Sequence, residues 1–200
     1  MSGDIEEILE IAPNLVAADG GAKAALSAGI VPESVIGDFD SLSAELRHSI
    51  PSDRLLHVSE QDSTDFEKCL SRISAPLILA LGFTGQRLDH ELAVYNALSR
   101  YPERACIVLG SHDLAFLAPP KVALALAPGD RVSLFPMAET TGQSDGLRWP
   151  IDGLRFAPSG RVGTSNMATG PVQLSFDALG MLIILPRAAL PAARAALSHG

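Results

Sequence analysis

Two aspartates separated by a single residue are the clearest candidates for metal chemistry in this sequence. Asp38 and Asp40 lie in the segment 37–41 (Gly-Asp-Phe-Asp-Ser), directly after the short apolar run at residues 35–36. Two carboxylates at a strand end suit one hard cation such as Mg²⁺, and Gly37 allows a sharp turn there. A solvated acidic turn is the alternative, because an Asp-x-Asp triplet by itself is common in loops.

A second acidic segment, residues 61–68, begins a predicted helix. Thr64 and the glutamate three residues later form a capping box, which places Asp65 in the first turn and Lys68 three residues further on. Helix starts bind phosphate well, so Asp65 is a candidate metal ligand and Lys68 a candidate phosphate contact. The alternative is that the aspartates of this segment only stabilise the helix dipole.

A third segment, residues 82–90, joins a buried strand to a helix through a glycine-containing loop. Gly82 and Gly85 allow the backbone to approach a ligand closely. Arg87 carries the planar fork of donors that clamps phosphate. Three uses are open for Asp89: it orients Arg87, caps the helix or reaches the metal.

The turn Asp19-Gly20-Gly21 is a weaker signal, because a strand-to-helix turn with two glycines is commonplace. It lies where a nucleotide would approach an α/β sheet. The sequence contains neither the P-loop pattern Gly-x-x-x-x-Gly-Lys-Ser/Thr nor a full Gly-x-Gly-x-x-Gly. An ATP site in this chain is therefore predicted to be of another kind.

Short apolar runs that alternate with helical patterns must position these segments. The predicted strands lie at residues 15–18, 35–36, 55–58, 77–81 and 106–109. Continuous apolar strands that alternate with helices indicate a parallel sheet covered on both faces, in which ligands bind at the carboxyl ends of the strands. Asp19, Asp38 and the Gly82 loop are therefore predicted to share one edge of the sheet.

From about Lys121 the pattern changes to strands in series with little helical periodicity. Predicted strands lie at residues 122–126, 131–135, 161–164, 172–176 and 181–185, after the stiff boundary Pro119-Pro120. Such a series predicts an antiparallel sandwich or barrel-like domain. We therefore expect an α/β domain over residues 1–118 and a β-domain over residues 119–200. The Ala-rich C-terminal stretch is expected to be helical or frayed.

The composition fits a globular protein and does not exclude a small anionic ligand. The 200 residues are 47% hydrophobic and carry a formal net charge of −8. This charge argues against general nucleic-acid binding but does not exclude ATP, which a metal ion and a few local donors can hold. No apolar run reaches the ~20 residues of a membrane span, and the acidic start has no signal core, so we expect a cytoplasmic protein. Cys69 and Cys106 are expected to be reduced and buried.

Taken in order, these segments resemble the thiamine pyrophosphokinase family. The matching stretches are residues 17–22, 35–41, 61–68, 85–90, 146–150 and 163–166. Each motif alone is weak, but together they follow the family order from about residue 5 to residue 186. The resemblance implies a Rossmann-like α/β domain that binds ATP and Mg²⁺, followed by an antiparallel β-sandwich that binds thiamine.

The resemblance also implies an activity and an assembly. The pyrophosphoryl group of ATP would pass to the thiamine hydroxyl, giving thiamine diphosphate and AMP. Magnesium is the implied cofactor, and the implied assembly is a homodimer with active sites at the subunit interface. No nucleic-acid or membrane partner is implied.

Motif by motif, the resemblance implies three groups of site residues. The catalytic group is Asp38, Asp40, Asp65, Lys68, Arg87 and Asp89, in which the first three residues are also the metal ligands. The ATP-binding group is Asp19, Gly20, Gly21, Gln61, Asp62, Thr64 and Gly85. The thiamine-binding group is Trp149, Ser165 and Asn166.

The sequence departs from the family pattern at three places. The family pattern begins with a strand and a glycine turn ahead of its first helix. The corresponding helix starts here near Asp4, and the sequence does not show that strand before it. Lys23 stands where asparagine is usual, and Gln86 stands where glycine is common. These differences bear on the details of phosphate contact and not on the reaction class.

Two other functions use similar residues. A phosphatase of the haloacid-dehalogenase type also has an Asp-x-Asp motif, but its first aspartate is a nucleophile on the first strand, whereas Asp38 follows a later strand. Such a phosphatase would also leave Asp65 and Arg87 unexplained. A catalytically inactive thiamine- or nucleotide-binding regulator would be expected to lose charged site residues, and the acidic motif positions are all present here. AMP formation that depends on thiamine would separate the three functions.

Overall fold

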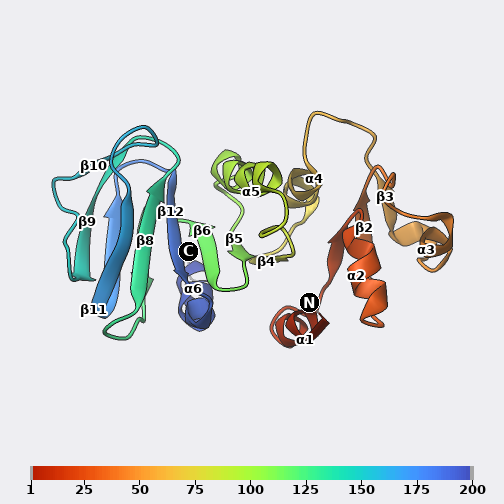
Figure 1. Ribbon diagram of the computed structural model, residues 1–200, viewed down its shortest axis with the longest axis horizontal. Coiled ribbons are helices and arrows are strands. Elements are labelled where there is room, and N and C mark those ends of the chain that lie inside the picture. Colours follow the sequence, from red (N-terminus) through yellow and green to blue (C-terminus); the bar gives the residue numbers. More distant parts are fainter. Residues whose placement is uncertain (1, 199–200) are drawn as a thin grey trace. The chain divides into compact units, whose positions relative to one another are not determined.

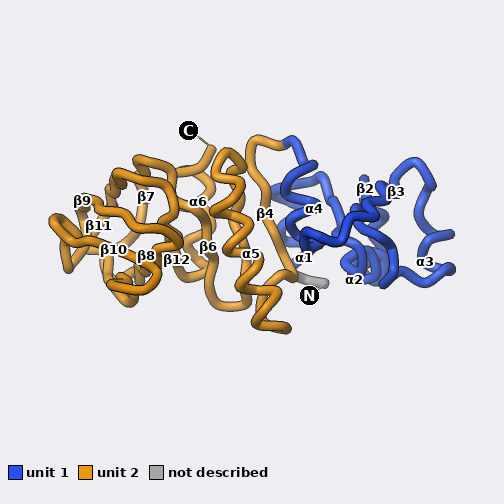
Figure 2. The backbone as a smooth tube through the Cα atoms, turned by 90° about the horizontal axis from the view of Figure 1, so that it is seen from above, with its two compact units in different colours: residues 1–74 blue, residues 75–200 orange. Residues whose placement is uncertain are grey.

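The computed structural model describes residues 2–198 and has a mixed α/β fold (Figure 1). Figure 2 shows its two compact units, residues 1–74 and residues 75–200. Unit 1 contains α1 (Ser2–Leu9), β1 (Val16–Ala18), α2 (Gly21–Ser27), β2 (Ser34–Gly37), α3 (Ala44–His48), η1 (Ser52–Arg54), β3 (Leu55–His57) and α4 (Asp65–Arg72).

Unit 1 is built on a small parallel sheet in the order β1-β2-β3. Ala17 pairs with Val35, and Ile36 with Leu56. Each strand is a short apolar run, as the sequence predicts. Because the strands are parallel, the segments that follow β1 and β2 emerge at the same edge of the sheet.

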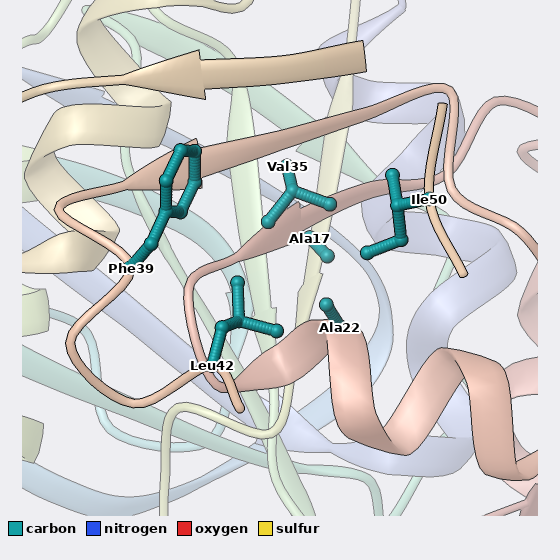
Figure 3. Close-up of a cluster of buried hydrophobic side chains, with 6 residues drawn as sticks. All are labelled: Ala17, Ala22, Val35, Phe39, Leu42 and Ile50. Carbon is teal, nitrogen blue, oxygen red and sulfur yellow. The ribbon is translucent and has the colours of Figure 1, made fainter. Parts of the chain in front are cut away.

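An apolar core fixes the loop that follows β2 (Figure 3). Phe39 and Leu42 from this loop are buried against Ala17 and Val35 of the sheet, together with Ala22 of α2 and Ile50. Burying a phenylalanine or leucine side chain contributes about 1.5–3 kcal/mol, so the loop is held by its own apolar residues. The polar residues between them are thereby held at the sheet edge.

Unit 2 is built on a larger mixed sheet. Its elements are β4 (Ile78–Leu81), α5 (Leu88–Arg100), β5 (Cys106–Leu109), β6 (Asp113–Leu117), β7 (Lys121–Leu124), β8 (Arg131–Pro136), β9 (Thr140–Leu147), β10 (Arg155–Phe156), β11 (Gly163–Phe176), β12 (Met181–Pro186), η2 (Arg187–Ala189) and α6 (Leu190–Leu197). The strand order is β10-β9-β11-β8-β12-β6-β5-β4, and β7 pairs with β11. Only the β4–β5 pair in this order is parallel.

The five N-terminal strands predicted to form one parallel sheet are divided between two sheets, so this expectation is wrong. Strands β4 and β5 belong to the larger sheet because β6 runs antiparallel to both β5 and β12 and joins them. The compact units accordingly divide after residue 74, whereas the expected domain boundary lies at residue 118. The assignment of ATP and thiamine to the two expected domains stays a prediction.

Strand β11 is a single long strand where the sequence suggested two shorter ones. Its first part pairs with β8, and its second part pairs with β7 on one side and β9 on the other. Two register shifts, at residues 163–166 and 168–173, let it change partners. Bulges of this kind bend a strand and re-aim its side chains.

Two smaller expectations are confirmed. Cys69 and Cys106 are free and buried, and burial raises the pKa of each thiol to about 12. The C-terminal alanine-rich stretch forms α6. Among the described residues, no helix is long and apolar enough to cross a membrane.

Candidate active site

Asp19 follows β1 and is 1% exposed. Its N–H donates to the Ile36 carbonyl at 2.9 Å, and its own carbonyl accepts from the Ala22 N–H at 3.0 Å, where α2 begins. Its Oδ2 accepts a long hydrogen bond from the Ser41 N–H at 3.4 Å. Its Oδ1 is buried and has no hydrogen-bond partner within residues 2–198. An unpaired buried carboxylate oxygen is costly, and a bound cation would satisfy it.

The loop after β2 packs closely against Asp19. A Cβ atom at Gly37 would lie 2.7 Å from the Cβ of Asp19, so only glycine fits at this position. The next residue but one, Phe39, has a left-handed backbone with φ of 66°. The Arg47 guanidinium donates to the Phe39 carbonyl and lies 5.3 Å from the centre of its ring. The backbone around Asp38 is therefore held by the close approach of Gly37 to Asp19 and by the contacts of Arg47 with Phe39.

Three carboxylates meet at this sheet edge. One oxygen each from Asp19, Asp38 and Asp40 lies within 4.8 Å of the others. Asp38 Oδ1 accepts from the Asp40 N–H at 3.2 Å, and Asp40 Oδ1 accepts from the Ser41 hydroxyl at 3.0 Å. An all-oxygen, acidic donor set with a partnerless buried oxygen fits a hard divalent cation such as Mg²⁺. The prediction that Asp19 and Asp38 share one sheet edge is confirmed, although the family resemblance grouped Asp19 with the ATP-binding residues and not with the metal ligands. The Gly82 loop, predicted at the same edge, instead follows β4 of the other sheet.

The cluster holds its carboxylates in different electrostatic states. Burial raises the pKa of Asp19, and the nearby charges of Asp65 and Asp38 add to this, while hydrogen bonds from Ser41 oppose it. The pKa of Asp38 is lowered, first by the backbone N–H of Asp40 and then by the side-chain amide of Gln61. Burial therefore disfavours the ionised form of Asp19, whereas hydrogen bonds favour the ionised form of Asp38.

Lys68 joins Asp38 to the start of α4. Its Nζ lies 3.6 Å from Asp38 Oδ2 and 3.6 Å from Asp65 Oδ1, and its side chain is 3% exposed. The helix begins after Thr64, whose hydroxyl accepts from the Glu67 N–H at 3.3 Å, and this is one of the two hydrogen bonds of the predicted capping box. Two carboxylates thus partner the amine of this buried lysine, as a buried cation requires.

The segment before α4 is held by an acid that the sequence did not single out. Glu60 accepts hydrogen bonds from the backbone N–H groups of Asp62 and Ser63 at 3.0 and 3.1 Å, and from the Ser63 hydroxyl. Gln61, between them, donates its amide to Asp38 Oδ2 at 3.0 Å. A carboxylate that precedes a helix start and accepts two backbone N–H groups is a common turn device, but its spacing alone did not identify it.

Unit 2 carries the glycine loop and its arginine. Gly82 and Gly85 have φ of 87° and 81°, conformations that favour glycine. The Gly85 N–H donates to Glu91 Oε2 at 3.0 Å, which ties the loop to α5. Arg87 donates to both oxygens of Asp89, at 3.2 and 2.6 Å. Of the three uses left open for Asp89, the structure has the pairing with Arg87.

The lone tryptophan lies at the surface of unit 2 and not in its core. Trp149 is 52% exposed, and the Arg148 guanidinium lies 4.9 Å from the centre of its ring. Asn166 clamps its backbone: Oδ1 accepts from the Trp149 N–H at 3.2 Å, and Nδ2 donates to the Trp149 carbonyl at 2.7 Å. The same Oδ1 accepts from the Met167 N–H at 2.8 Å, so its two lone pairs are both used.

The candidate residues thus form three groups, one in unit 1 and two in unit 2. Unit 1 gathers an acidic cluster, which we define as Asp19, Asp38, Asp40, Gln61, Asp65 and Lys68. Next to it in sequence, Gly20 and Gly21 are exposed and lead into α2. Unit 2 contributes the Arg87 loop and the Trp149–Asn166 clamp. Together the residue types suit a metal-dependent enzyme that handles phosphate and an aromatic ligand.

Comparisons with known proteins identify the class. The family model described as "Thiamin pyrophosphokinase, catalytic domain" matches residues 5–109. This match covers more than half of the chain, and the chain therefore belongs to the thiamin pyrophosphokinase family. The resemblance seen in the sequence is confirmed, and the comparisons give no support to a haloacid-dehalogenase-type phosphatase.

Individual relatives agree with this membership. Thiamine pyrophosphokinases 1 and 3 of rice, Oryza sativa subsp. japonica, are 28% and 30% identical to the chain over 155 residues. These matches cover 68% of the chain but only 59% and 58% of the rice proteins. The crystal structure of thiamin pyrophosphokinase from Geobacillus thermodenitrificans is 26% identical, with a TM-score of 0.73 over 86% of this chain and 85% of that one.

Proposed function

We propose that this chain transfers the diphosphoryl group of ATP to the hydroxyl of thiamine, giving thiamine diphosphate and AMP. The observation that carries the proposal is the acidic cluster, with the partnerless Oδ1 of Asp19, in a chain of this family. In this reaction the thiamine hydroxyl oxygen bonds to the β-phosphorus. The bond from that phosphorus to the α,β-bridging oxygen breaks, AMP leaves, and a carboxylate accepts the hydroxyl proton.

Asp38, Asp40 and Asp65 are the proposed Mg²⁺ ligands, and the position of Asp19 supports it as a further one. Bound Mg²⁺ would neutralise negative charge on the phosphate oxygens. The protein itself fixes the position of the Asp38 carboxylate. The Gln61 amide and the Asp40 N–H donate to it, and the buried Lys68 amine lies beside it. Such preorganised charges reduce the reorganisation needed during transfer.

Lys68 and Arg87 are the proposed cations on the ATP side. The surroundings of Lys68 support a second role, because its Nζ lies between two carboxylates and would keep them from repelling each other. Arg87 is two-thirds exposed, and its guanidinium donates to both oxygens of Asp89, which orients it at the surface of unit 2. The remaining proposed ATP contacts are Asp19, Gly20, Gly21, Gln61, Asp62, Thr64 and Gly85.

Trp149, Ser165 and Asn166 are the proposed thiamine side. An exposed indole offers a flat apolar surface for an aromatic ring. The clamp limits what Asn166 can do: both lone pairs of Oδ1 and one Nδ2 hydrogen are used, which leaves one N–H to donate. We therefore propose that Asn166 donates to a ring nitrogen of the aminopyrimidine and accepts nothing from it.

We further propose a homodimer in which the acidic cluster of one subunit faces the thiamine side of the other, with strands β7–β12 forming a β-sandwich. The change of partners along β11 supports the sandwich, because one strand there contributes to two groups of strands. The homodimer itself follows from the family resemblance of the sequence.

The proposed function is tested by following nucleotides in a reaction that contains ATP, Mg²⁺ and the purified protein. We expect AMP to form only when thiamine is added, in a one-to-one ratio with thiamine diphosphate. A protein that binds thiamine but forms no AMP would be an inactive regulator and would contradict the proposal. Orthophosphate release without thiamine would identify a phosphatase.

A further inference from the structure

Strand β11 carries a bulge beside the thiamine-side residues. Gly163 pairs with Leu134 of β8, and Asn166 pairs with Val132. Two residues of β11, Thr164 and Ser165, therefore lie opposite a single residue of β8, which is Ser133. This two-against-one arrangement defines a β-bulge, and it shifts the pairing by one residue.

Ser165 has an unusual backbone at this bulge. Its φ is 63°, in the left-handed region that a residue with a side chain seldom adopts. A bulge leaves a backbone group without its ladder partner, and here the Ser165 N–H donates to the side chain of Ser133 at 3.0 Å. The hydroxyl of Ser133 thus replaces a backbone carbonyl as the acceptor.

Ser133 is well placed to hold the bulge. It is 4% exposed, at the middle of β8. The guanidinium of Arg131 donates to the same Oγ at 3.4 Å and also pairs with Asp113 of β6. The Ser133 hydroxyl therefore accepts from both Arg131 and the Ser165 N–H. Because Ser133 and Ser165 lie on paired strands, the sheet sets the distance between them.

The bulge decides where Asn166 points. Successive side chains alternate between the two faces of a sheet, so a shift of one residue moves a side chain to the other face. Asn166 directly follows the bulge, and its amide reaches the backbone of Trp149 on both the N–H and the carbonyl side. Loss of the bulge would therefore break the clamp on Trp149.

We propose that Ser133 is a positioning residue for thiamine: its buried hydroxyl stabilises the β11 bulge and so sets the positions of Ser165, Asn166 and Trp149. This inference rests on the proposed function for its effect on catalysis. Its structural part, the link from Ser133 through the bulge to Trp149, stands independently.

The test compares Ser133→Ala with Ser133→Thr, which keeps the hydroxyl. Ser144→Ala is the matched control, because the Ser144 hydroxyl also accepts a backbone N–H, from Ile151 at 3.0 Å, which lies two residues after Trp149 but outside the bulge. We expect Ser133→Ala to raise the KM for thiamine about five- to tenfold, the scale of one hydrogen bond, with the KM for ATP unchanged. Ser133→Thr and Ser144→Ala should remain near wild type.

Amide hydrogen exchange supplies a readout that needs no activity. In Ser133→Ala, the Ser165 N–H loses its acceptor, and the Trp149 N–H should exchange at least about tenfold faster because the clamp loosens. Among the described residues no hydrogen bond joins Trp149 to Ser133, so an effect confined to the neighbours of Ser133 would leave the exchange of the Trp149 N–H unchanged. In the Ser144→Ala control, only Ile151 should become less protected. If Ser133→Ala does not fold, Ser133→Cys replaces it, since a thiol is a weak acceptor of similar size.

The outcomes separate the two ideas. A wild-type protein that makes no thiamine diphosphate would contradict the proposed function, while the exchange measurement would still test the link to Trp149. An active wild type with unchanged Trp149 exchange and unchanged thiamine KM in Ser133→Ala would overturn the inference. Equal losses for thiamine and ATP, or a Ser133→Thr variant as impaired as Ser133→Ala, would overturn it as well.

Discussion

At the scale of single residues, two of the clustered carboxylates, Asp19 and Asp38, have pKa values shifted in opposite directions. The pKa of Asp19 is raised by burial, whereas the pKa of Asp38 is lowered by hydrogen bonds from Asp40 and Gln61. A cation at this place would stabilise the ionised form of Asp19, which burial disfavours. This difference gives the cluster a reason to bind metal beyond its collection of negative charges.

Our first prediction concerns the aspartate pair. Asp38→Asn and Asp40→Asn should keep the fold and lower kcat by about 100-fold or more, because a neutral amide is a poor ligand for Mg²⁺. Each variant should also lose most of the rise in Tm that Mg²⁺ gives the wild-type protein. Calorimetry and steady-state kinetics measure these two effects.

The matched control for these variants is Asp53→Asn, an exposed carboxylate of the same unit that lies outside the cluster. It should retain wild-type kcat and the wild-type response to Mg²⁺. Near-normal turnover of both cluster variants at ordinary Mg²⁺ concentration would refute the role assigned to the pair.

The second prediction concerns Lys68. The Lys68 amine lies 3.6 Å from a carboxylate oxygen of Asp38 and 3.6 Å from one of Asp65. Methionine has a similar length but no charge, so the two carboxylates would repel each other. Lys68→Met should lower kcat/KM for ATP by about 10- to 1,000-fold and leave the KM for thiamine nearly unchanged. Lys68→Arg should retain part of the activity because it keeps the charge. A defect confined to thiamine would show that the amine serves the other substrate.

At the scale of elements, the loop after β2 gains its geometry from a close approach and a buried ring. Gly37 lets the strand end pass against Asp19, and Phe39 turns into the core with a left-handed backbone (Figure 3). The two aspartates that flank the ring are thereby kept at the sheet edge. A change that moves this loop should disturb the cluster without touching a carboxylate.

The third prediction tests this coupling. Gly37→Ala would place a methyl group 2.7 Å from the Cβ of Asp19, and overpacking of this kind typically costs about 1–3 kcal/mol. We expect a lower Tm, and a loss of Mg²⁺-dependent stabilisation larger than the loss of Tm explains. The control is Gly170→Ala, where an added methyl meets nothing within 4 Å. If Gly37→Ala binds Mg²⁺ as the wild type does, the close approach is not what shapes the cluster.

The sequence predicted most elements but not all of their partners. Apolar runs located β1 to β5, because buried parallel strands are continuous in hydrophobicity. Strand β9 was missed because Thr140–Leu147 contains two glycines, a serine and an aspartate, and only its pairing with β11 makes it a strand. Strand β6 was missed because it follows β5 after only a short turn, and its pairing with β12 is not local.

The same limit applies to the candidate site. Motif spacing predicted Asp38, Asp40, Asp65 and Lys68, since these lie on short segments with clear strand or helix signals. It placed Asp19 at the same sheet edge as Asp38 but did not predict how closely the two approach, because that contact depends on the absent side chain of Gly37. Nor did it predict the bulge at Ser165, which depends on a buried hydroxyl from another strand.

At the scale of the whole molecule, the chain holds its candidate residues in two compact units. The acidic cluster belongs to the first unit, and the Arg87 loop and the Trp149–Asn166 clamp belong to the second. A reaction between ATP and thiamine requires these groups to act together. In the proposed homodimer, a complete site takes them from both subunits.

The fourth prediction follows from that arrangement. Asp40→Asn and Asn166→Ala should each be nearly inactive at low thiamine, but mixing and reassociating the two variants should restore about one quarter of wild-type activity, because half of the dimers are then mixed and each has one intact site. Dimers should appear in sedimentation or light scattering. No recovery in a sample proven to contain mixed dimers would contradict sites shared between subunits.

The most direct test of the central claim follows the phosphates of ATP. With ATP that carries ¹⁸O on its γ-phosphate, mass spectrometry should find the label in the terminal phosphate of thiamine diphosphate and unlabelled AMP as the nucleotide product. Both should form at the same rate, and both should require Mg²⁺ and thiamine. Formation of ADP with thiamine monophosphate, or of labelled orthophosphate without thiamine, would contradict diphosphoryl transfer by this chain.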